Sequence, residues 1–336
     1  MPSYTSNSNQ RLPKVAPGRL IGVAVLAFVA LLGAVEGAAR WAGFQPNANH
    51  DKGLWCLERD RLAKAGENGV ALLGASRIHC GVVPTVLSEL SGKDAVMLAI
   101  SGTKPMATLE SLAADESFRG TVICSTILPW MLEPNWNAQQ EYIQYYDESW
   151  SPARALSRRA SLFAEERLAL LHQGFSYTAL LNRLRGRPYV NYIEFQSDRY
   201  KKADYGRMGG YLAAQRQKQV KNNSTLYDTM RIPSTAEMEP RYARVEAIVE
   251  TLLARGCRVV FLRMPTGDEC WELDEQHWPK AKYWDRFAQG TKAETVHFRD
   301  YESLNRFECP DCSHLDDTDA VQFTAALAEI LFREGE

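Results

Sequence analysis

The hydrophobic pattern begins with an uninterrupted apolar run near the N-terminus. Residues 20–35 are all Leu, Ile, Val, Ala, Phe or Gly. Sixteen residues fall slightly short of the ~20 that a membrane-spanning helix needs, but the run extends through 37–41 to Trp41 at an interface. Basic residues precede it, and they are Arg11, Lys14 and Arg19. The pattern therefore predicts a transmembrane anchor over residues 17–41, with the N-terminal end in the cytoplasm and the rest exported.

Two alternatives to an uncleaved anchor stay open. Gly37-Ala38-Ala39 has the small residues of a signal-peptide cleavage site. The run could also be a buried core helix. The charge of Glu36 and the apolar length favour the anchor, which would hold the protein in the inner (plasma) membrane with its C-terminal domain in the periplasm.

Beyond the apolar run, strand-like and helix-like patterns alternate. Each buried strand-like run is followed by a turn of small residues and then by an amphipathic helix. This repeat predicts a three-layer α/β/α fold with a mostly parallel sheet, and such folds build their sites where the strands end. The predicted strands are 70–73, 95–100 and 120–126, and the predicted helices are 83–90 and 105–114.

The alternation stops between about 131 and 235 and then resumes. Residues 151–172 read as a helix, and the stretch 183–231 holds eleven Lys/Arg against four Asp/Glu. That stretch also keeps aromatic residues, which a flexible linker would lack: Tyr189, Tyr192, Phe195, Tyr200, Tyr205 and Tyr211. The later pattern predicts helices 237–254 and 316–332 around strands 257–262 and 295–298.

These patterns divide the chain into six parts. The predicted parts are a cytoplasmic tail (1–16), the anchor (17–41), a linker (42–67), the first part of an α/β domain (68–130), a mainly helical or irregular insertion (131–235) and the second part of the α/β domain (236–336).

Composition narrows the class of protein. With 336 residues and 45% hydrophobic residues the chain can bury a sizeable core. Its net charge of -2 argues against a general nucleic-acid binder. Some of the seven cysteines should pair in an oxidising periplasm, although Cys124 and Cys257 lie in strand-like runs and are expected to be buried thiols.

Two short segments, far apart in the chain, carry candidate chemistry. Ser76 lies in a Gly-x-Ser turn after the first strand, and Asp311 and His314 lie three apart before the final helix. A serine needs a base to remove its proton and a third group to orient that base. The three residues supply these roles, so we expect Ser76 Oγ and a His314 ring nitrogen to lie within about 4 Å.

The order of these motifs resembles that of the SGNH (GDSL-like) hydrolase superfamily over roughly residues 68–130 and 240–333. It is most similar to the membrane-anchored branch of alginate-acetylation and D-alanyl-teichoic-acid biosynthesis proteins. The resemblance implies that Ser76 is the nucleophile, His314 the general base and Asp311 its orienting partner. It also implies an oxyanion hole formed by the backbone N–H groups of Ser76 and Gly102, and it implies no cofactor.

The chain departs from the family pattern at one block. The third strand should be followed by Gly-x-Asn-Asp, but here it reads Cys124-Ser125-Thr126-Ile127-Leu128-Pro129, without Asn. Loss of one oxyanion donor costs on the order of 3 kcal/mol of transition-state stabilisation. Either Ser125 or Thr126 substitutes, or the site works without this donor.

Other residues near the predicted site have competing interpretations. Arg263 ends a strand, where it would bind a substrate carboxylate or the oxyanion, or simply cap the strand. Arg77 and His79 are expected to be structural. The set Cys309, Cys312 and His314 has ligand types that zinc accepts, but a second cysteine pair is missing and we assign no metal.

The sequence thus predicts a membrane-anchored, periplasm-facing serine esterase or O-acyltransferase acting on acyl esters of a cell-envelope glycan. It would work alone or within an envelope polysaccharide-modification complex. The alternative is a non-catalytic glycan-binding or scaffold subunit of such a complex or of an export complex, in which the basic, tyrosine-rich insertion binds an acidic polysaccharide. A solvated helical face is the simpler interpretation of that insertion.

Overall fold

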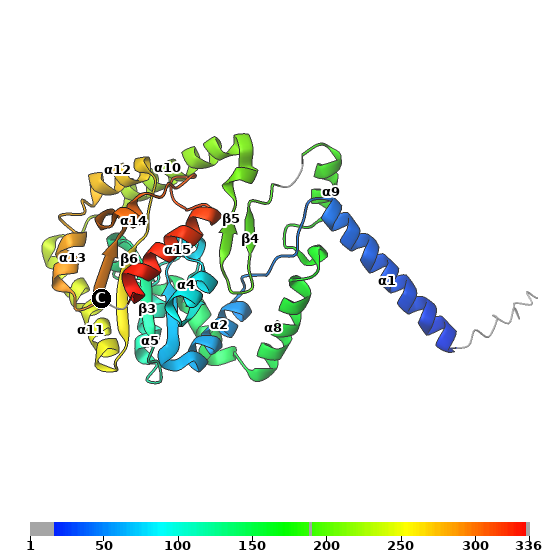
Figure 1. The fold of residues 1–336 in the computed structure, drawn as a ribbon, viewed down its shortest axis with the longest axis horizontal. Coiled ribbons are helices and arrows are strands. Elements are labelled where there is room, and N and C mark those ends of the chain that lie inside the picture. Colours follow the sequence, from blue (N-terminus) through cyan, green and yellow to red (C-terminus); the bar gives the residue numbers. More distant parts are fainter. Residues whose placement is uncertain (1–16, 188–189, 334–336) are drawn as a thin grey trace, which may run out of the picture.

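The computed structural model describes residues 17–187 and 190–333 (Figure 1). Its centre is a five-stranded sheet in the order β2-β1-β3-β6-β7, in which every neighbouring pair is parallel. The strands are β1 (Gly69–Leu73), β2 (Asp94–Met97), β3 (Thr121–Ser125), β6 (Arg258–Arg263) and β7 (Glu294–His297). The expected α/β class with a mostly parallel sheet is confirmed.

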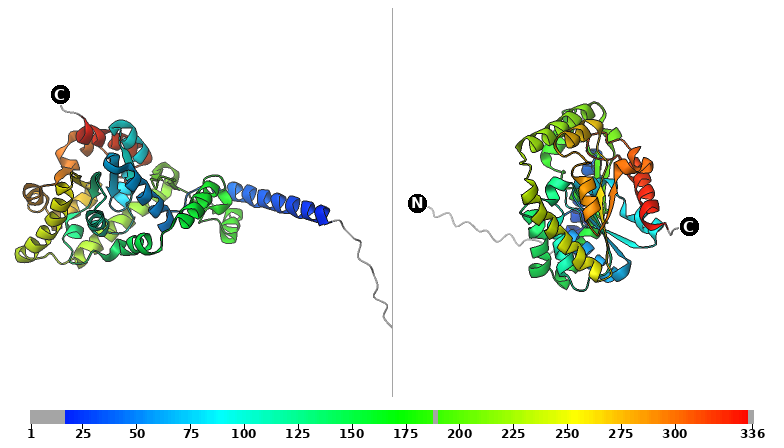
Figure 2. Two further views of the ribbon diagram at one scale, coloured as in Figure 1. Left: turned by 90° about the horizontal axis from the view of Figure 1, so that it is seen from below. Right: turned by 90° about the vertical axis from the view of Figure 1, so that its left-hand side faces the viewer.

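Helices cover both faces of this sheet (Figure 2). Side chains alternate along a strand, so Ala71 and Leu73 of β1 point to one face while Val70 and Leu72 point to the other. The first face packs against α2 (Lys52–Ala65), α5 (Met106–Ala114), α11 (Thr235–Ala254) and α13 (Trp284–Gly290). The second packs against α3 (Ser76–Gly81), α4 (Pro84–Ser91), α14 (Glu302–Asn305) and α15 (Asp317–Phe332).

The predicted linker 42–67 is wrong as a description of this segment. It contains α2, which Asp51 caps by accepting a hydrogen bond from the Leu54 backbone N–H. Trp55 and Leu62 of this helix lie in the core, and the Trp55 indole donates to the Leu98 carbonyl at 3.0 Å. Charged residues interspersed along α2, of which Glu58 and Arg59 are themselves buried, obscured its apolar side in the sequence.

The region between β3 and β6 is built from short helices and one hairpin. The two strands, β4 (Ile193–Phe195) and β5 (Lys201–Ala203), pair antiparallel and apart from the main sheet. The helices are α6 (Leu128–Met131), α7 (Gln140–Gln144), α8 (Pro152–Glu165), α9 (Tyr177–Leu184) and α10 (Leu212–Thr229), and α12 (Asp268–His277) follows β6. Of the aromatic residues expected here, Tyr200 and Tyr205 are buried, Tyr211 is exposed and Tyr189 lies outside the described residues.

The apolar N-terminal run forms α1 (Pro17–Trp41), which projects from the α/β body (Figures 1 and 2). Its segment Gly18–Trp41 is long and apolar enough to cross a membrane, and most of the apolar side chains on it are exposed. The C-terminal end of the helix is docked, because Glu36 accepts hydrogen bonds from the backbone N–H groups of Ala169 and Leu170. Ala39 packs in the same small apolar cluster as Phe44.

Candidate active site

Ser76 lies where the chain passes from the interior strand β1 into the helix α3. Gly74 follows the strand, and a Cβ at this position would approach Ile78 Cγ2 to 2.4 Å and the Ser125 carbonyl to 3.0 Å. Only glycine fits such a close approach, so it permits the tight turn that carries Ser76 into the first position of α3. An N–H at this position has no partner inside its own helix.

The structure brings the three predicted residues into one hydrogen-bonded chain. His314 Nε2 lies 2.8 Å from Ser76 Oγ, and His314 Nδ1 lies 2.9 Å from Asp311 Oδ2. The separation expected from the sequence is therefore confirmed, across 238 positions of the chain. The contacts suit an imidazole that donates to the carboxylate through Nδ1 and accepts from the serine through Nε2.

Asp311 is held rigidly from several sides. It is 1% exposed, and its Oδ1 accepts from the backbone N–H groups of Ser313 at 3.0 Å and His314 at 2.9 Å. Burial alone would raise the pKa of Asp311, but the hydrogen bonds from His314 and Ser313 outweigh it and leave the pKa below its ordinary value. The carboxylate is thus ionised at neutral pH and able to stabilise a protonated His314.

Tyr205 of the insertion also reaches this carboxylate. Burial raises the pKa of Tyr205, and the charge and side-chain hydrogen bond of Asp311 raise it further. The Tyr205 backbone N–H donates to Asp316 Oδ2 at 3.0 Å, so the insertion contacts the loop of His314 on both sides. Nothing in the sequence pattern singled out Tyr205 among its neighbouring tyrosines.

A cleft of about 190 Å³ opens beside Ser76. Gly102 lines it and has φ +77, a left-handed conformation that favours glycine. The chain before Gly102 stays in register with β1 beyond the end of β2, because Leu98 donates to the Leu72 carbonyl and Ile100 to the Gly74 carbonyl. This continued pairing brings the Gly102 turn to the same cleft as Ser76.

Several polar side chains line the cleft near the end of β3. Ser125 and Thr126 both line the cleft, but the Thr126 hydroxyl donates to the Ile127 carbonyl at 3.2 Å. Across from them, α10 of the insertion presents Gln219 and Asn223 to the cleft, followed by Leu226 and Tyr227. The Asn223 amide donates to Cys270 Sγ at 3.0 Å. Sequence reasoning missed these residues, although their spacing of four, three and one is that of a single helix face.

Arg263 reaches the predicted edge of the sheet but is not free to bind a carboxylate. It is 5% exposed, and its guanidinium forms a buried ion pair with Asp274 of α12. Its other terminal nitrogen donates to the Met264 carbonyl at 2.7 Å. The substrate-binding role expected for Arg263 is therefore corrected: Asp274 already neutralises its charge, so the pair forms part of the cleft wall.

The two residues expected to be structural differ in their surroundings. Arg77 lines the cleft and its Nε donates to Ser313 Oγ at 3.3 Å, which links the two chain segments of the site. His79 points away from the cleft, and its Nδ1 lies 3.2 Å from Ser101 Oγ. It is buried in the wall of a second cavity.

The cysteines do not support a zinc site. All seven are buried thiols, as expected for Cys124 and Cys257, and those predicted to lie in loops are equally buried. Both ring nitrogens of His314 are engaged by Ser76 and Asp311, so the imidazole is not available beside Cys309 and Cys312. Cys312 Sγ instead accepts from the Cys270 backbone N–H at 3.2 Å.

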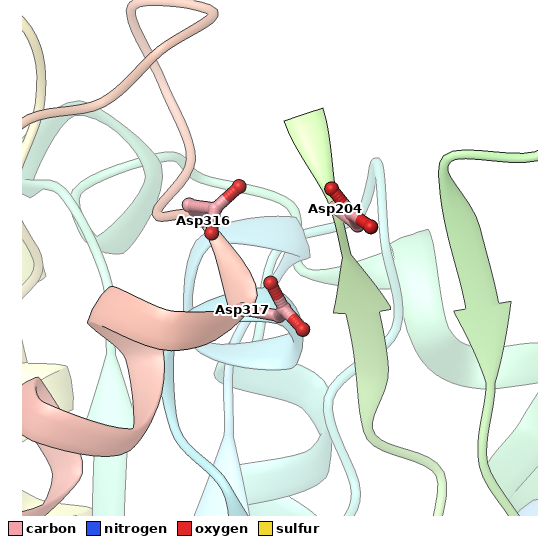
Figure 3. Close-up of side chains that lie close together, drawn as sticks. All are labelled: Asp204, Asp316 and Asp317. Atoms are coloured by element: carbon pink, nitrogen blue, oxygen red, sulfur yellow. The ribbon is translucent and has the colours of Figure 1, made fainter. Parts of the chain in front are cut away.

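Three carboxylates gather near the start of α15 (Figure 3). They are Asp204, Asp316 and Asp317, and among residues 17–187 and 190–333 they form the one group of His, Cys, Asp or Glu side chains close enough to share a metal ion. Arg207 pairs with Asp204 at 2.7 Å, and Lys202 pairs with Asp317 at 3.3 Å. These two cations offset two of the three charges, and Asp316 accepts from the backbone N–H groups of Tyr205 and Thr318, so the cluster is interpreted as a structural contact between the insertion and α15.

Comparison of the chain with protein-family models and with curated proteins gave no match. The geometry suits nucleophilic acyl chemistry, because it combines a serine, a hydrogen-bonded imidazole, an ionised carboxylate and a cleft beside the serine hydroxyl.

Proposed function

We propose that this protein is a membrane-anchored, periplasm-facing serine esterase or O-acyltransferase of the SGNH type that acts on acyl esters of a cell-envelope glycan. The observation that carries the proposal is the chain of hydrogen bonds Ser76–His314–Asp311 beside an open cleft. The helical layers on both sides of the parallel sheet agree with the α/β/α architecture of that superfamily.

The proposed reaction begins with attack of Ser76 Oγ on the carbonyl carbon of an acyl ester. His314 Nε2 takes the serine proton, and Asp311 stabilises the resulting imidazolium. The backbone N–H groups of Ser76 and Gly102 donate to the tetrahedral oxyanion. Collapse breaks the ester bond, the alcohol leaves with the proton from His314, and the acyl group remains on Ser76.

The second half of the reaction decides between the two activities. Attack by water on the acyl-serine releases a carboxylic acid, which is hydrolysis. Attack by a sugar hydroxyl forms a new ester, which is transfer. In both cases His314 removes the proton from the attacking oxygen and returns a proton to Ser76. The missing Asn donor favours transfer or slow turnover over vigorous hydrolysis.

The anchored location is supported by α1. Its exposed apolar surface suits a lipid environment, while Glu36 and Ala39 at its end contact the rest of the protein. Cleavage at residues 37–39 would remove contacts that hold the start of the domain. These observations favour an uncleaved anchor.

A fluorophosphonate probe tests the nucleophile directly. The full chain in detergent should be labelled, and Ser76→Ala should abolish labelling because the attacking hydroxyl is gone. Ser224→Ala, which removes a hydroxyl of α10 that pairs with Asp228 and does not line the cleft, is the matched control and should keep its labelling. An unlabelled wild-type protein with a native far-UV circular dichroism spectrum would contradict the enzyme and leave the glycan-binding subunit, which a polysaccharide-binding assay would then test.

A further inference from the structure

A second cavity lies on the other side of the Ser101-Gly102 turn. It has a volume of about 410 Å³, far more than one water molecule needs. Ser101 lines this cavity, whereas Gly102 lines the cleft beside Ser76. The segment that follows α1 forms another wall, through Asn47 and Asn49. The cavity therefore lies between the α/β body and the segment that follows the proposed membrane anchor.

The described residues that line this cavity carry positive charge and no acidic side chain. Arg199 and Lys201 both come from the β4–β5 hairpin of the insertion. Within the part of the chain that the structure describes, no carboxylate lies within ion-pair distance of either cation. Lys201 Nζ donates instead to Ser101 Oγ at 2.9 Å. A buried cation without a counterion is unfavourable, so the cavity favours an anion.

Arg199 adds an independent observation. It is 1% exposed and has φ +66, an unusual conformation for a residue with a side chain. Its Nε donates to the Met97 carbonyl at 3.1 Å and one terminal nitrogen to the Ala99 carbonyl at 2.7 Å, while Nη1 is buried without a hydrogen-bond partner. Strained, buried charges of this kind persist where the surrounding structure requires them, and they gather at functional sites.

Three histidines line the cavity as neutral groups, and they are His50, His79 and His172, whose pKa burial also lowers. The rings of His50 and His79 stack at 5.2 Å. Burial lowers the pKa of His50 to about 3 and that of His79 well below its ordinary value, and the nearby charges of Arg199 and Lys201 lower both further. At neutral pH these rings add polar hydrogen-bonding surface, and the charge of the cavity comes from Arg199 and Lys201.

We propose that this cavity binds a phosphate group, held by Lys201 Nζ, the Ser101 hydroxyl and the charge of Arg199. Several donors from different chain segments suit a tetrahedral oxyanion, which accepts hydrogen bonds from many directions. The phosphate group has two possible sources, a lipid headgroup at the nearby membrane or a soluble phosphate. The site does not depend on the acyl chemistry proposed for Ser76.

The test is calorimetric titration of the full chain in detergent with inorganic phosphate and, separately, with dihexanoyl phosphatidic acid below its micelle concentration. Lys201→Gln should weaken binding at least tenfold. Lys202→Gln is the matched control. Lys202 is next to Lys201 in the sequence, but its own side chain pairs with Asp317 and does not line the cavity. Ser101→Ala should weaken binding less than Lys201→Gln, and the melting temperature of each variant reports on folding.

The outcomes separate the possibilities. Lys201-dependent binding of the lipid but not of inorganic phosphate assigns the site to a headgroup, and binding of both with equal affinity assigns it to phosphate itself. Absence of binding by the wild-type chain overturns the proposal. Equal losses of phosphate affinity in Lys201→Gln and Lys202→Gln also overturn the proposal, since they would indicate attraction by surface charge alone. Tighter binding of galacturonate than of either phosphate compound would overturn the assignment to phosphate.

Discussion

At the scale of single residues, the geometry of the site depends on a few positions at which the surrounding atoms allow only one residue type or one side-chain orientation. Gly74 provides the close approach that turns the chain toward Ser76, and the buried carboxylate of Asp311 is fixed by backbone N–H groups before it meets His314. The proposed nucleophile and base are therefore oriented before any substrate binds. Such preorganisation is what nucleophilic catalysis requires.

The role of Asp311 makes a prediction at this scale. Asp311→Asn should lower kcat for ester cleavage by about 10³- to 10⁴-fold, because an amide does not hold His314 in the tautomer that accepts the serine proton. Steady-state kinetics with an acetyl ester would measure this loss. Asp319→Asn, in the same C-terminal region but with no contact to His314, should keep its kcat. Similar kinetics for Asp311→Asn and the wild type would rule out the triad.

At the scale of elements, the insertion is more than a charged surface. Of its eleven basic residues in 183–231, Arg199 and Lys201 are turned inward, and several others have acidic partners. Arg216 pairs with Glu269, Arg207 with Glu194 and Arg231 with Glu237. Pairing on this scale weakens the interpretation of the insertion as an open basic patch for an acidic polysaccharide. The insertion instead supplies walls to both cavities.

The helix α2 provides a test of the element that the sequence pattern did not reveal. Trp55→Ala should lower the free energy of unfolding by about 3–5 kcal/mol, because it empties a fully buried site and leaves the Leu98 carbonyl without its indole donor. Urea unfolding followed by circular dichroism measures the loss. Leu90→Ala, at a position 57% exposed, should change stability by no more than about 0.5 kcal/mol. A similarly small loss of unfolding free energy in Trp55→Ala would contradict the place of α2 in the core and support the linker interpretation.

At the scale of the whole molecule, buried histidines link folding to pH. Burial lowers the pKa of His50 to about 3 and of His297 to about 2, and it lowers the pKa of His79 and of His172 as well. Each ring stays neutral in the folded state but binds a proton in the unfolded state below about pH 6.5. Stability from these residues is therefore present above pH 6.5 and is lost as the pH falls.

Glu58 acts in the opposite direction over part of the same range. Burial raises its pKa to about 7, although Arg61 lies 3.2 Å from Oε2. Because the folded state holds this proton more tightly, Glu58 contributes stability that grows as the pH falls from about 7 toward 4.5. Four histidines oppose one glutamate, so the net effect of acid is destabilising.

The resulting prediction is that the free energy of unfolding falls between pH 6.5 and 5.0 by at most about 4 kcal/mol per pH unit, the contribution of three net protons. Urea titrations at several pH values would measure the slope. His297→Asn should make the slope shallower, and Glu58→Gln should make it steeper while raising stability above pH 7. A stability that does not change between pH 7.5 and 5.0 would contradict this assignment of buried neutral histidines.

The sequence by itself determined the features that depend on a local pattern of residues. The apolar helix, the alternating strands and helices, the serine after the first strand and the Asp-x-x-His before the last helix all follow from periodicity and short spacing. Two parallel strands end at the same edge, so the meeting of Ser76 and His314 also followed once the strand order was recognised. These predictions succeeded because each depends on neighbours in sequence or on a general rule of topology.

Only the tertiary structure decided which distant side chains face these segments. The partner of Arg263 is Asp274, the wall opposite Ser76 comes from α10, and Tyr205 reaches Asp311 from the insertion. The basic stretch 183–231 is typical of a surface in its sequence, yet the buried Arg199 of this stretch lines a cavity beside Ser101. The physical reason is that burial and pairing depend on packing between different elements, most of them far apart in the chain, and no local period of hydrophobic residues records which elements will meet.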